Sequence, residues 1–287
     1  MKNILIASIF LFLGTSYAQQ IDPLQTSDAE NQERWVENIL NNLTLKEKIG
    51  QLFMIQAYSN KDENHTKEIN KAIKKYHIGG LIFMQGTPEK QAELTNIYQA
   101  TSKIPLLIGF DGEWGLNMRL KNSFRYPWNM TLGAVQNNKL IEQFGEQLGK
   151  HCKRIGIHVN FAPVVDINTN PANPIIGNRS FGENKYNVTE KAIAFTNGMQ
   201  STGVLANAKH FPGHGDTSTD SHKTLPFLDF TLERLDSIEL FPYKKLFKTN
   251  LASVMVAHLN VPSLEPKPGV PTSISYKVIT ELLKEKM

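Results

Sequence analysis

Short runs of apolar residues alternate along this chain with segments of helical spacing. The runs lie at residues 52–57, 79–84, 105–110, 157–162, 204–208 and 252–257. Between them, apolar residues recur three and four positions apart, as they do on the buried face of a helix. Strands that are apolar on both sides and separated by helices are typical of a parallel sheet whose two faces are both covered. The alternation therefore predicts an α/β fold.

Two helix starts are marked by local sequence. Thr44 and Glu47 have the spacing of a capping box, and Thr87 precedes Pro88, which fits the first turn of a helix. Further helices are predicted at residues 33–43, 67–76, 140–155, 188–201, 232–248 and 275–287. Long loops that follow strands are predicted at residues 126–131 and 168–183.

Polar side chains follow the apolar runs where each predicted strand ends. They are Gln56, Gln85, Asp111, Asp166, Lys209 and His258. Function-bearing residues at the carboxyl ends of successive strands indicate a (β/α)8 TIM-type barrel. A doubly wound open sheet is the alternative, although it usually concentrates its ligand groups at one switch point. We expect a TIM-type barrel that is truncated after about six strands in this chain.

The first residues predict export. Residues 1–18 combine Lys2, an apolar stretch and a small-residue cleavage site ending at Ala18, which together are typical of a secretory signal peptide. A buried N-terminal helix is the alternative. The apolar stretch is too short to span a bilayer comfortably, so no membrane span is expected. We expect a periplasmic or secreted protein with a flexible leader at 19–29 and one domain at 30–287.

Composition argues against several other classes of function. The formal net charge of +4 is small and evenly spread, which argues against a nucleic-acid partner. The only cysteine, Cys152, cannot form an internal disulfide, and no catalytic motif surrounds it. Four histidines in helices, turns or the middle of a strand are predicted to be structural: His65, His77, His151 and His158.

The strand at 204–208 leads into a loop rich in titratable groups. Residues 209–222 hold three histidines, two aspartates and one lysine, and Pro212 stiffens the turn. Structural loops rarely need three imidazoles, so this loop is the leading candidate for a functional site. Lys209 and His210 lie at the strand end and should face the mouth of the barrel.

The far end of this loop suggests proton transfer. Asp220 lies two residues before His222, where it can fix the imidazole tautomer and raise its pKa, which suits His222 to general acid/base chemistry. A metal site is the rival interpretation, although no regular metal-binding spacing is present. That site would use His210, His214, Asp216 and His222. We instead expect His214 and Asp216 to form hydrogen bonds within the loop.

Two other loops carry candidate binding groups. Asp111 and Arg119 follow the third strand and could bind a polyol through a carboxylate and a planar guanidinium, or could form a salt bridge that holds the loop. Arg179 could point into the site, with Asp166 orienting it or a neighbour, and a loop-stabilising pair is the alternative. His258 would reach the same mouth or serve only as a rim residue.

These segments together resemble the signature of glycoside hydrolase family 3, in its β-N-acetylhexosaminidase branch. Residues 111–119, 162–166, 178–182 and 209–222 agree with that signature in order and spacing, and the resemblance covers residues 30–287. It implies a TIM-type barrel and a retaining mechanism with an Asp nucleophile. The β-glucosidase branch lacks the histidine loop, so glucosidase activity is not expected.

The resemblance also implies roles for individual residues. The hydroxyls of a terminal N-acetylglucosamine would be held by Asp111, Arg119, Arg179, Lys209 and His210, with His258 at the same mouth. His222, partnered by Asp220, would be the acid/base, where most glycosidases use a carboxylic acid. Glu113 is expected to be structural rather than catalytic. No metal or organic cofactor is implied.

Two departures from the family pattern matter. Many members read Asp-x-Glu-Gly-Gly-Arg in the first motif, whereas this chain has Trp114 and Leu116, which change the rim of the site. The family's nucleophile lies at the end of the seventh strand, and no residue here matches it. We therefore expect the nucleophile beyond Met287 and expect the 287-residue chain alone to be inactive.

The expected activity is that of a retaining β-N-acetylhexosaminidase. It would remove terminal non-reducing β-linked N-acetylglucosamine from a carbohydrate substrate such as a peptidoglycan fragment or a chitooligosaccharide. Two alternatives stay open. One is a phosphorylase of the same branch, because a histidine acid/base leaves room for an anionic phosphate. The other is a glycan-binding protein without catalysis.

Overall fold

The fold is built on one sheet of six parallel strands. The computed structural model of the protein describes residues 22–219 and 224–287. The strands are β1 (Met54–Ala57), β2 (Gly80–Phe83), β3 (Leu107–Phe110), β4 (Val159–Asn160), β5 (Leu205–Phe211) and β6 (Ser253–Val256). Each strand pairs in parallel with the next one along the chain. This sequential order is that of a (β/α)8 barrel and excludes the doubly wound alternative, whose strand order reverses.

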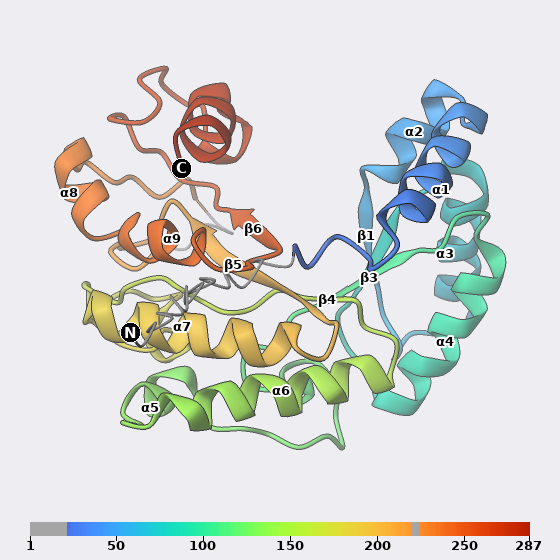
Figure 1. Ribbon diagram of the computed structural model, residues 1–287, viewed down its shortest axis with the longest axis horizontal. Helices are drawn as coiled ribbons and strands as arrows, with labels where there is room; N and C mark the ends of the chain where they lie inside the picture. The colour runs from blue at the N-terminus through green and yellow to red at the C-terminus, as the bar shows by residue number, and fades with distance from the viewer. Residues whose placement is uncertain (1–21, 220–223) are drawn as a thin grey trace, which may run out of the picture.

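Helices connect the strands and cover the outside of the curved sheet (Figure 1). They are α1 (Ala29–Asn42), α2 (Leu45–Gln51), α3 (Glu63–Tyr76), α4 (Pro88–Thr101), α5 (Asn129–Gly133), α6 (Asn138–Arg154), α7 (Lys185–Gln200), α8 (Leu232–Ser237), α9 (Phe241–Leu246) and the π-helix η4 (Lys277–Lys286). Short 3-10 turns lie at η1 (Leu116–Met118), η2 (Gly177–Arg179) and η3 (Thr272–Ile274). Within the described ranges, no helix is long and apolar enough to cross a membrane.

Local sequence signals at two helix starts are confirmed. The Thr44 side chain accepts a hydrogen bond from the Glu47 N–H while the Glu47 carboxylate accepts one from the Thr44 N–H, which completes the capping box. At α4, Thr87 caps the helix and Pro88 occupies its first turn, where the missing N–H leaves no hydrogen bond unmade. Helix α1 begins at Ala29, the last residue of the predicted leader.

Several predicted boundaries are wrong, including those of one helix, one loop and one strand. The helix predicted at 232–248 is two short helices, because Pro242 lacks an N–H and its ring clashes with the preceding turn, so that α9 begins afresh there. Residues 126–131, predicted as loop, include the start of α5. Strand β5 continues to Phe211, beyond the predicted end at Ala208, and so includes Lys209 and His210.

The core lies between the sheet and its helices. Its largest cluster joins Phe83 on β2 and Phe110 on β3 to Tyr98 on α4 and Phe195 on α7. Cys152 on α6 is buried in this cluster, and burial raises the pKa of its thiol to about 12. Because the thiolate is the nucleophilic form, this cysteine is a packing residue, as predicted.

Helices α6 and α7 approach each other at two glycines. A Cβ atom at Gly198 on α7 would lie 1.9 Å from the backbone oxygen of Glu142 on α6. One at Gly145 on α6 would lie 2.3 Å from the backbone oxygen of Phe195 on α7. Non-bonded atoms do not approach so closely in a packed interior, so any side chain at either position would push the helices apart.

The substitution Gly198→Ala is expected to destabilise the fold by about 1–3 kcal/mol, because the added methyl group overpacks the contact between the two helices. In an exposed helix the same change would stabilise by about 1 kcal/mol, so the sign of the effect is diagnostic. Chemical denaturation followed by circular dichroism measures the free energy of unfolding. The neighbouring exposed substitution Asn197→Ala serves as the control and should change it by less than about 0.5 kcal/mol. A stabilised Gly198→Ala variant would contradict the close helix contact.

Candidate active site

A cavity of about 510 Å³ lies at the carboxyl ends of strands β3, β5 and β6. Its lining consists of Ile82, Asp111, Glu113, Trp114, Met118, Arg119, Ile175, Arg179, Lys209, His210, His214, Met255, Val256, Ala257 and His258. The structure thus brings together all the residues predicted to bind substrate. The predicted acid/base pair, Asp220 and His222, lies outside the described residues.

Lys209 is the buried centre of an ionic cluster in this cavity. The backbone of Lys209 is fixed in strand β5. The Lys209 N–H donates to the Pro163 carbonyl, and the Lys209 carbonyl accepts from the Val165 N–H. The side chain is only 2% exposed, and Nζ lies 2.9 Å from Asp111 Oδ1 and 2.8 Å from Glu113 Oε1. An ammonium group removed from water needs such partners, because its desolvation costs several kcal/mol.

Glu113 joins Lys209 to the loop that carries Arg179. Its two carboxylate oxygens accept from Arg179 Nε at 2.9 Å and from Arg179 Nη2 at 2.8 Å, a bidentate pair. Burial alone would raise the pKa of Glu113, but the charges of Lys209 and Arg179 outweigh it and lower the pKa to about 2. Glu113 is therefore ionised and orients both cations, which agrees with its predicted structural role.

Asp111 shares its carboxylate between two cations and is less deeply buried. Arg119 Nη2 lies 2.6 Å from Oδ2, while Lys209 Nζ contacts Oδ1. Burial alone would raise the pKa of Asp111, but Lys209 and Arg119 hold it below its usual range. The salt bridge considered as an alternative role for Asp111 and Arg119 is thus present. Both side chains nevertheless line the cavity, so the salt bridge and a binding role are compatible.

Asp166 positions His210 and His214, which form a second layer of the site next to the ionic cluster. It is buried, and its carboxylate contacts His210 Nδ1 at 2.6 Å and accepts from the backbone N–H groups of His210 at 3.2 Å and His214 at 2.7 Å. Burial alone would raise the pKa of Asp166, but its interactions with His210 and His214 lower it to about 2. Of the roles considered for Asp166, the structure supports orienting a neighbour, and that neighbour is His210.

His210 is held as a neutral imidazole of one tautomer. Arg179 Nη2 approaches His210 Nε2 at 3.4 Å, and a guanidinium can only donate, so Nε2 accepts and Nδ1 carries the proton given to Asp166. Burial lowers the pKa of His210, and the charges of Lys209 and Arg179 lower it further against the opposing effect of Asp166. The ring is therefore uncharged at neutral pH.

The start of the histidine loop is fixed from two sides. His214 Nδ1 lies 2.7 Å from Thr217 Oγ1, a contact within the loop as predicted. The Asp216 carboxylate pairs at 3.0 Å with Arg234 of α8, a contact outside the loop that the sequence did not predict. The same guanidinium contacts Glu239 at 2.7 Å, so α8 anchors this part of the loop through one arginine.

His258 lies just beyond the end of β6 and lines the cavity. Its Nδ1 contacts Ser273 Oγ at 2.5 Å, in the segment that carries η3. It lines the same cavity as Lys209 and His210, as its position after the sixth strand predicts. This contact also fits the alternative of a rim histidine satisfied by its neighbours.

The described cluster balances three carboxylates against three cations. Asp111, Glu113 and Asp166 are ionised, and the cations are Lys209, Arg119 and Arg179. Such a cavity offers fixed donors and acceptors close together, which suits a neutral ligand with many hydroxyl groups. In the described part of the chain, no group of three or more His, Cys, Asp or Glu side chains is placed to hold a metal ion.

Two residues with predicted supporting roles prove central to the site. Glu113, predicted to be structural, positions both Lys209 and Arg179. Asp166, predicted either to orient a neighbour or to stabilise its loop, holds His210 in one tautomer. Both are acids at or just after a strand end, and that position is the one signal in the sequence that distinguishes them.

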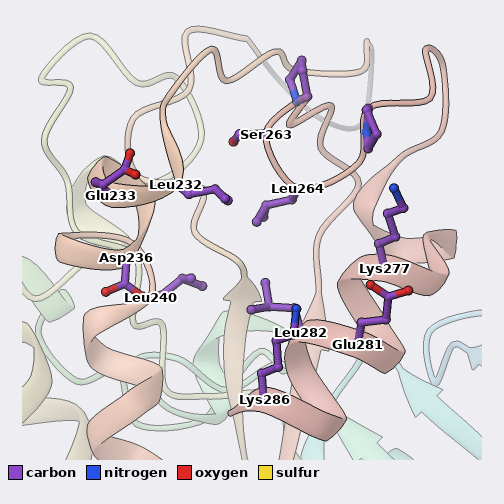
Figure 2. Close-up of a pocket in the computed structure, with 12 residues that line it drawn as sticks. Leu232, Glu233, Asp236, Leu240, Ser263, Leu264, Lys277, Glu281, Leu282 and Lys286 are labelled. Carbon is purple, nitrogen blue, oxygen red and sulfur yellow. The ribbon is translucent and has the colours of Figure 1, made fainter.

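A larger cavity of about 660 Å³ lies between α8 and η4. Figure 2 shows Glu233 and Asp236 on α8 and Lys277, Glu281 and Lys286 on η4, with leucine side chains between them. None of the predicted site residues lines it. Its charged groups lie on two sides of the leucine side chains and do not converge on one point, so we assign the chemistry to the smaller cavity.

Comparison with known proteins gives one consistent family. The family described as "Glycosyl hydrolase family 3 N terminal domain" matches residues 44–287. The chain is 34% identical to "Beta-hexosaminidase A" of Pseudoalteromonas piscicida over 243 residues, which cover 77% of this chain and 41% of that protein.

Solved structures agree. A glycoside hydrolase family 3 beta-N-acetylglucosaminidase from Paenibacillus sp. str. FPU-7 is similar with a TM-score of 0.76 at 37% identity, covering 84% of this chain and 47% of that one. The "Beta-glucoside phosphorylase BglX" is similar with a TM-score of 0.83 at 26% identity, covering 88% and 47%. The chain thus spans less than half the length of each of these three proteins. Because the family match includes every strand and all the loops that build the cavity, the chain belongs to glycoside hydrolase family 3.

Proposed function

We propose that the protein is a retaining β-N-acetylhexosaminidase that removes terminal non-reducing β-linked N-acetylglucosamine. The observation that carries the proposal is the buried cluster of Lys209, Glu113, Arg179 and Asp111 in one cavity. It occurs in a chain similar to proteins named beta-hexosaminidase and beta-N-acetylglucosaminidase. Natural substrates would be peptidoglycan fragments or chitooligosaccharides, met in the periplasm or outside the cell.

The cluster would bind the terminal sugar through its hydroxyl groups. Asp111 is the most exposed of the buried acids and can accept from two adjacent hydroxyls, while Lys209, Arg119 and Arg179 donate. His210 is neutral and fixed by Asp166, so it adds a hydrogen-bonding group without adding charge. The Glu113 side chain is fully buried against Lys209 and Arg179, and it serves to keep these two cations in position.

Proton transfer would come from the loop that follows β5. We propose that His222, held by Asp220, gives a proton to the leaving oxygen and later takes one from water. The support for this is the Asp220 and His222 spacing in the sequence and the resemblance to the family signature.

A phosphorylase is the second candidate. The similarity to a beta-glucoside phosphorylase, with its TM-score of 0.83, is the observation in its favour. Such an enzyme would use inorganic phosphate in place of water as the acceptor.

The substitution Asp111→Asn is expected to lower kcat/KM for a β-linked N-acetylglucosamine disaccharide by about 100-fold, because charge-assisted hydrogen bonds to two hydroxyls are lost together. Sugar release by the complete gene product measures this. Asp229→Asn, the same change at an exposed position, is the control and should retain wild-type activity. Activity of Asp111→Asn equal to wild type would contradict the proposed binding site. Strong acceleration of the wild type by added phosphate would favour the phosphorylase.

Glu113 should make stability depend on acid pH. Its folded-state pKa of about 2 lies below the ordinary value of 4.5, so this carboxylate stabilises the fold above pH 4.5 and loses that contribution as the pH falls toward 2. The contribution is on the order of 3 kcal/mol. Glu113→Gln should therefore be less stable at pH 7, and its free energy of unfolding should fall less between pH 4.5 and pH 2 than that of the wild type.

Denaturant unfolding at a series of pH values measures this difference. Asp166 titrates in the same acid range in both proteins, so the difference between the two curves reports Glu113. Glu93→Gln on α4, where the carboxylate is exposed, should give a curve that overlies the wild type. Parallel wild-type and Glu113→Gln curves would show that the ionised Glu113 does not stabilise this cluster.

His222→Ala should lower kcat for an alkyl-type leaving group, such as a sugar, by about 10²–10⁴-fold, because the proton that the leaving oxygen needs is no longer supplied. An aryl glycoside, whose leaving group departs without a proton, should be affected far less. Steady-state kinetics on both substrates measures the split. His151→Ala on α6, outside the cavity, is the control. Wild-type activity of His222→Ala on the sugar-linked substrate would exclude His222 as the acid/base.

A further inference from the structure

One aromatic residue of the cavity, Trp114, has no role in the proposed binding of the terminal sugar. We call the part of the cavity lining that it forms the aromatic wall. Trp114 lines the cavity together with Met118 and Ile175. Its side chain is partly exposed, whereas the adjacent Glu113 side chain is fully buried among cations. Trp114 is therefore accessible from the cavity, unlike the fully buried carboxylate beside it.

A second aromatic ring supports Trp114 from outside the cavity. The Trp114 and Trp128 ring centroids are 4.2 Å apart at an interplanar angle of 55°, and the Arg125 guanidinium lies 5.1 Å from the Trp128 ring. Trp128 and Arg125 do not line the cavity. Trp128, whose ring is itself contacted by Arg125, therefore packs against Trp114 without lining the cavity.

The backbone of Trp114 is fixed as well. The Tyr126 N–H donates to the Trp114 carbonyl at 3.1 Å. The next residue, Gly115, has φ of +101°, and a Cβ atom there would lie 2.8 Å from the Tyr126 ring, so only glycine fits this approach. The indole is thus held in place before any ligand arrives, which reduces the ordering cost of binding against it.

The same segment is tied to the sugar-binding cluster. Asn129, next to Trp128, donates from Nδ2 to the Arg179 carbonyl at 2.8 Å. The aromatic wall and the Arg179 guanidinium are therefore positioned by one connected set of contacts. A ligand whose hydroxyls reach Arg179 therefore lies in the cavity that Trp114 also lines.

We propose that Trp114 stacks against the leaving-group sugar and makes the protein select a saccharide over a small alcohol at that position. The proposal rests on the proposed function, in which the terminal sugar occupies the ionic cluster and the rest of the glycan extends toward solvent. A pyranose ring has an apolar face of C–H groups, and a fixed indole buries that face without requiring a charged partner.

Binding to the complete protein separates the two subsites. Isothermal calorimetry with N-acetylglucosamine measures the terminal-sugar site alone, and the non-hydrolysable thio-linked β-1,4 disaccharide of N-acetylglucosamine measures both. Trp114→Ala is expected to weaken disaccharide binding by about tenfold and to change monosaccharide binding by less than about twofold, because only the stacking contact is removed. Trp114→Phe, which keeps an aromatic face, should give an intermediate loss for the disaccharide.

Phe124→Ala is the matched control, since Phe124 is an exposed aromatic of the same loop that does not line this cavity. It should bind both ligands like the wild type. An equal loss for both ligands in Trp114→Ala and Trp114→Phe, or no loss in either, would overturn the proposal while leaving the terminal-sugar site intact. Failure of the wild type to bind either ligand would instead overturn the proposed function, and this inference with it.

Discussion

The arrangement of the site depends on one buried cation. Lys209 lies on β5 with its ammonium group almost fully removed from water, which is costly unless charged partners replace the lost hydration. Asp111 and Glu113, from the loop after β3, supply those partners, and Glu113 extends the network to Arg179 in the loop after β4. Two loops and one strand that are distant in sequence are thereby fixed relative to one another by the requirement to neutralise one lysine.

A second layer makes this arrangement specific. The Asp166 carboxylate accepts hydrogen bonds from two backbone N–H groups and from the His210 ring. It therefore fixes both the path of the chain at the end of β5 and the tautomer of His210. The neutral His210 then accepts from Arg179, the cation that Glu113 also holds. The two layers therefore share Arg179 and stabilise each other. The binding groups are positioned before ligand arrives, and this preorganisation is what a site built for a polyhydroxylated ligand needs.

The sequence was informative where a physical pattern repeats and uninformative where partners come from distant segments. Continuously apolar runs predicted all six strands, because strands buried on both faces have few polar residues. Strand ends predicted which residues would gather, because the carboxyl ends of parallel strands lie along one edge. The bidentate pair of Glu113 with Arg179 joins residues 66 positions apart, and no local pattern specifies such a pair. The break before α9 is marked in the sequence by Pro242 alone, because the helical spacing of apolar residues continues across it.

The charge balance of the described cluster bears on the charge of the ligand that the cluster can hold. Lys209, Arg119 and Arg179 each already contact a carboxylate, and Glu113 alone takes up two of them. An incoming phosphate would have to compete with these buried acids, whose low pKa values keep them ionised at neutral pH. A neutral sugar or water meets no such competition, because it can insert hydrogen bonds without displacing a charge. Among the described residues, the electrostatics therefore favour a neutral sugar over an anion as the ligand of this cluster.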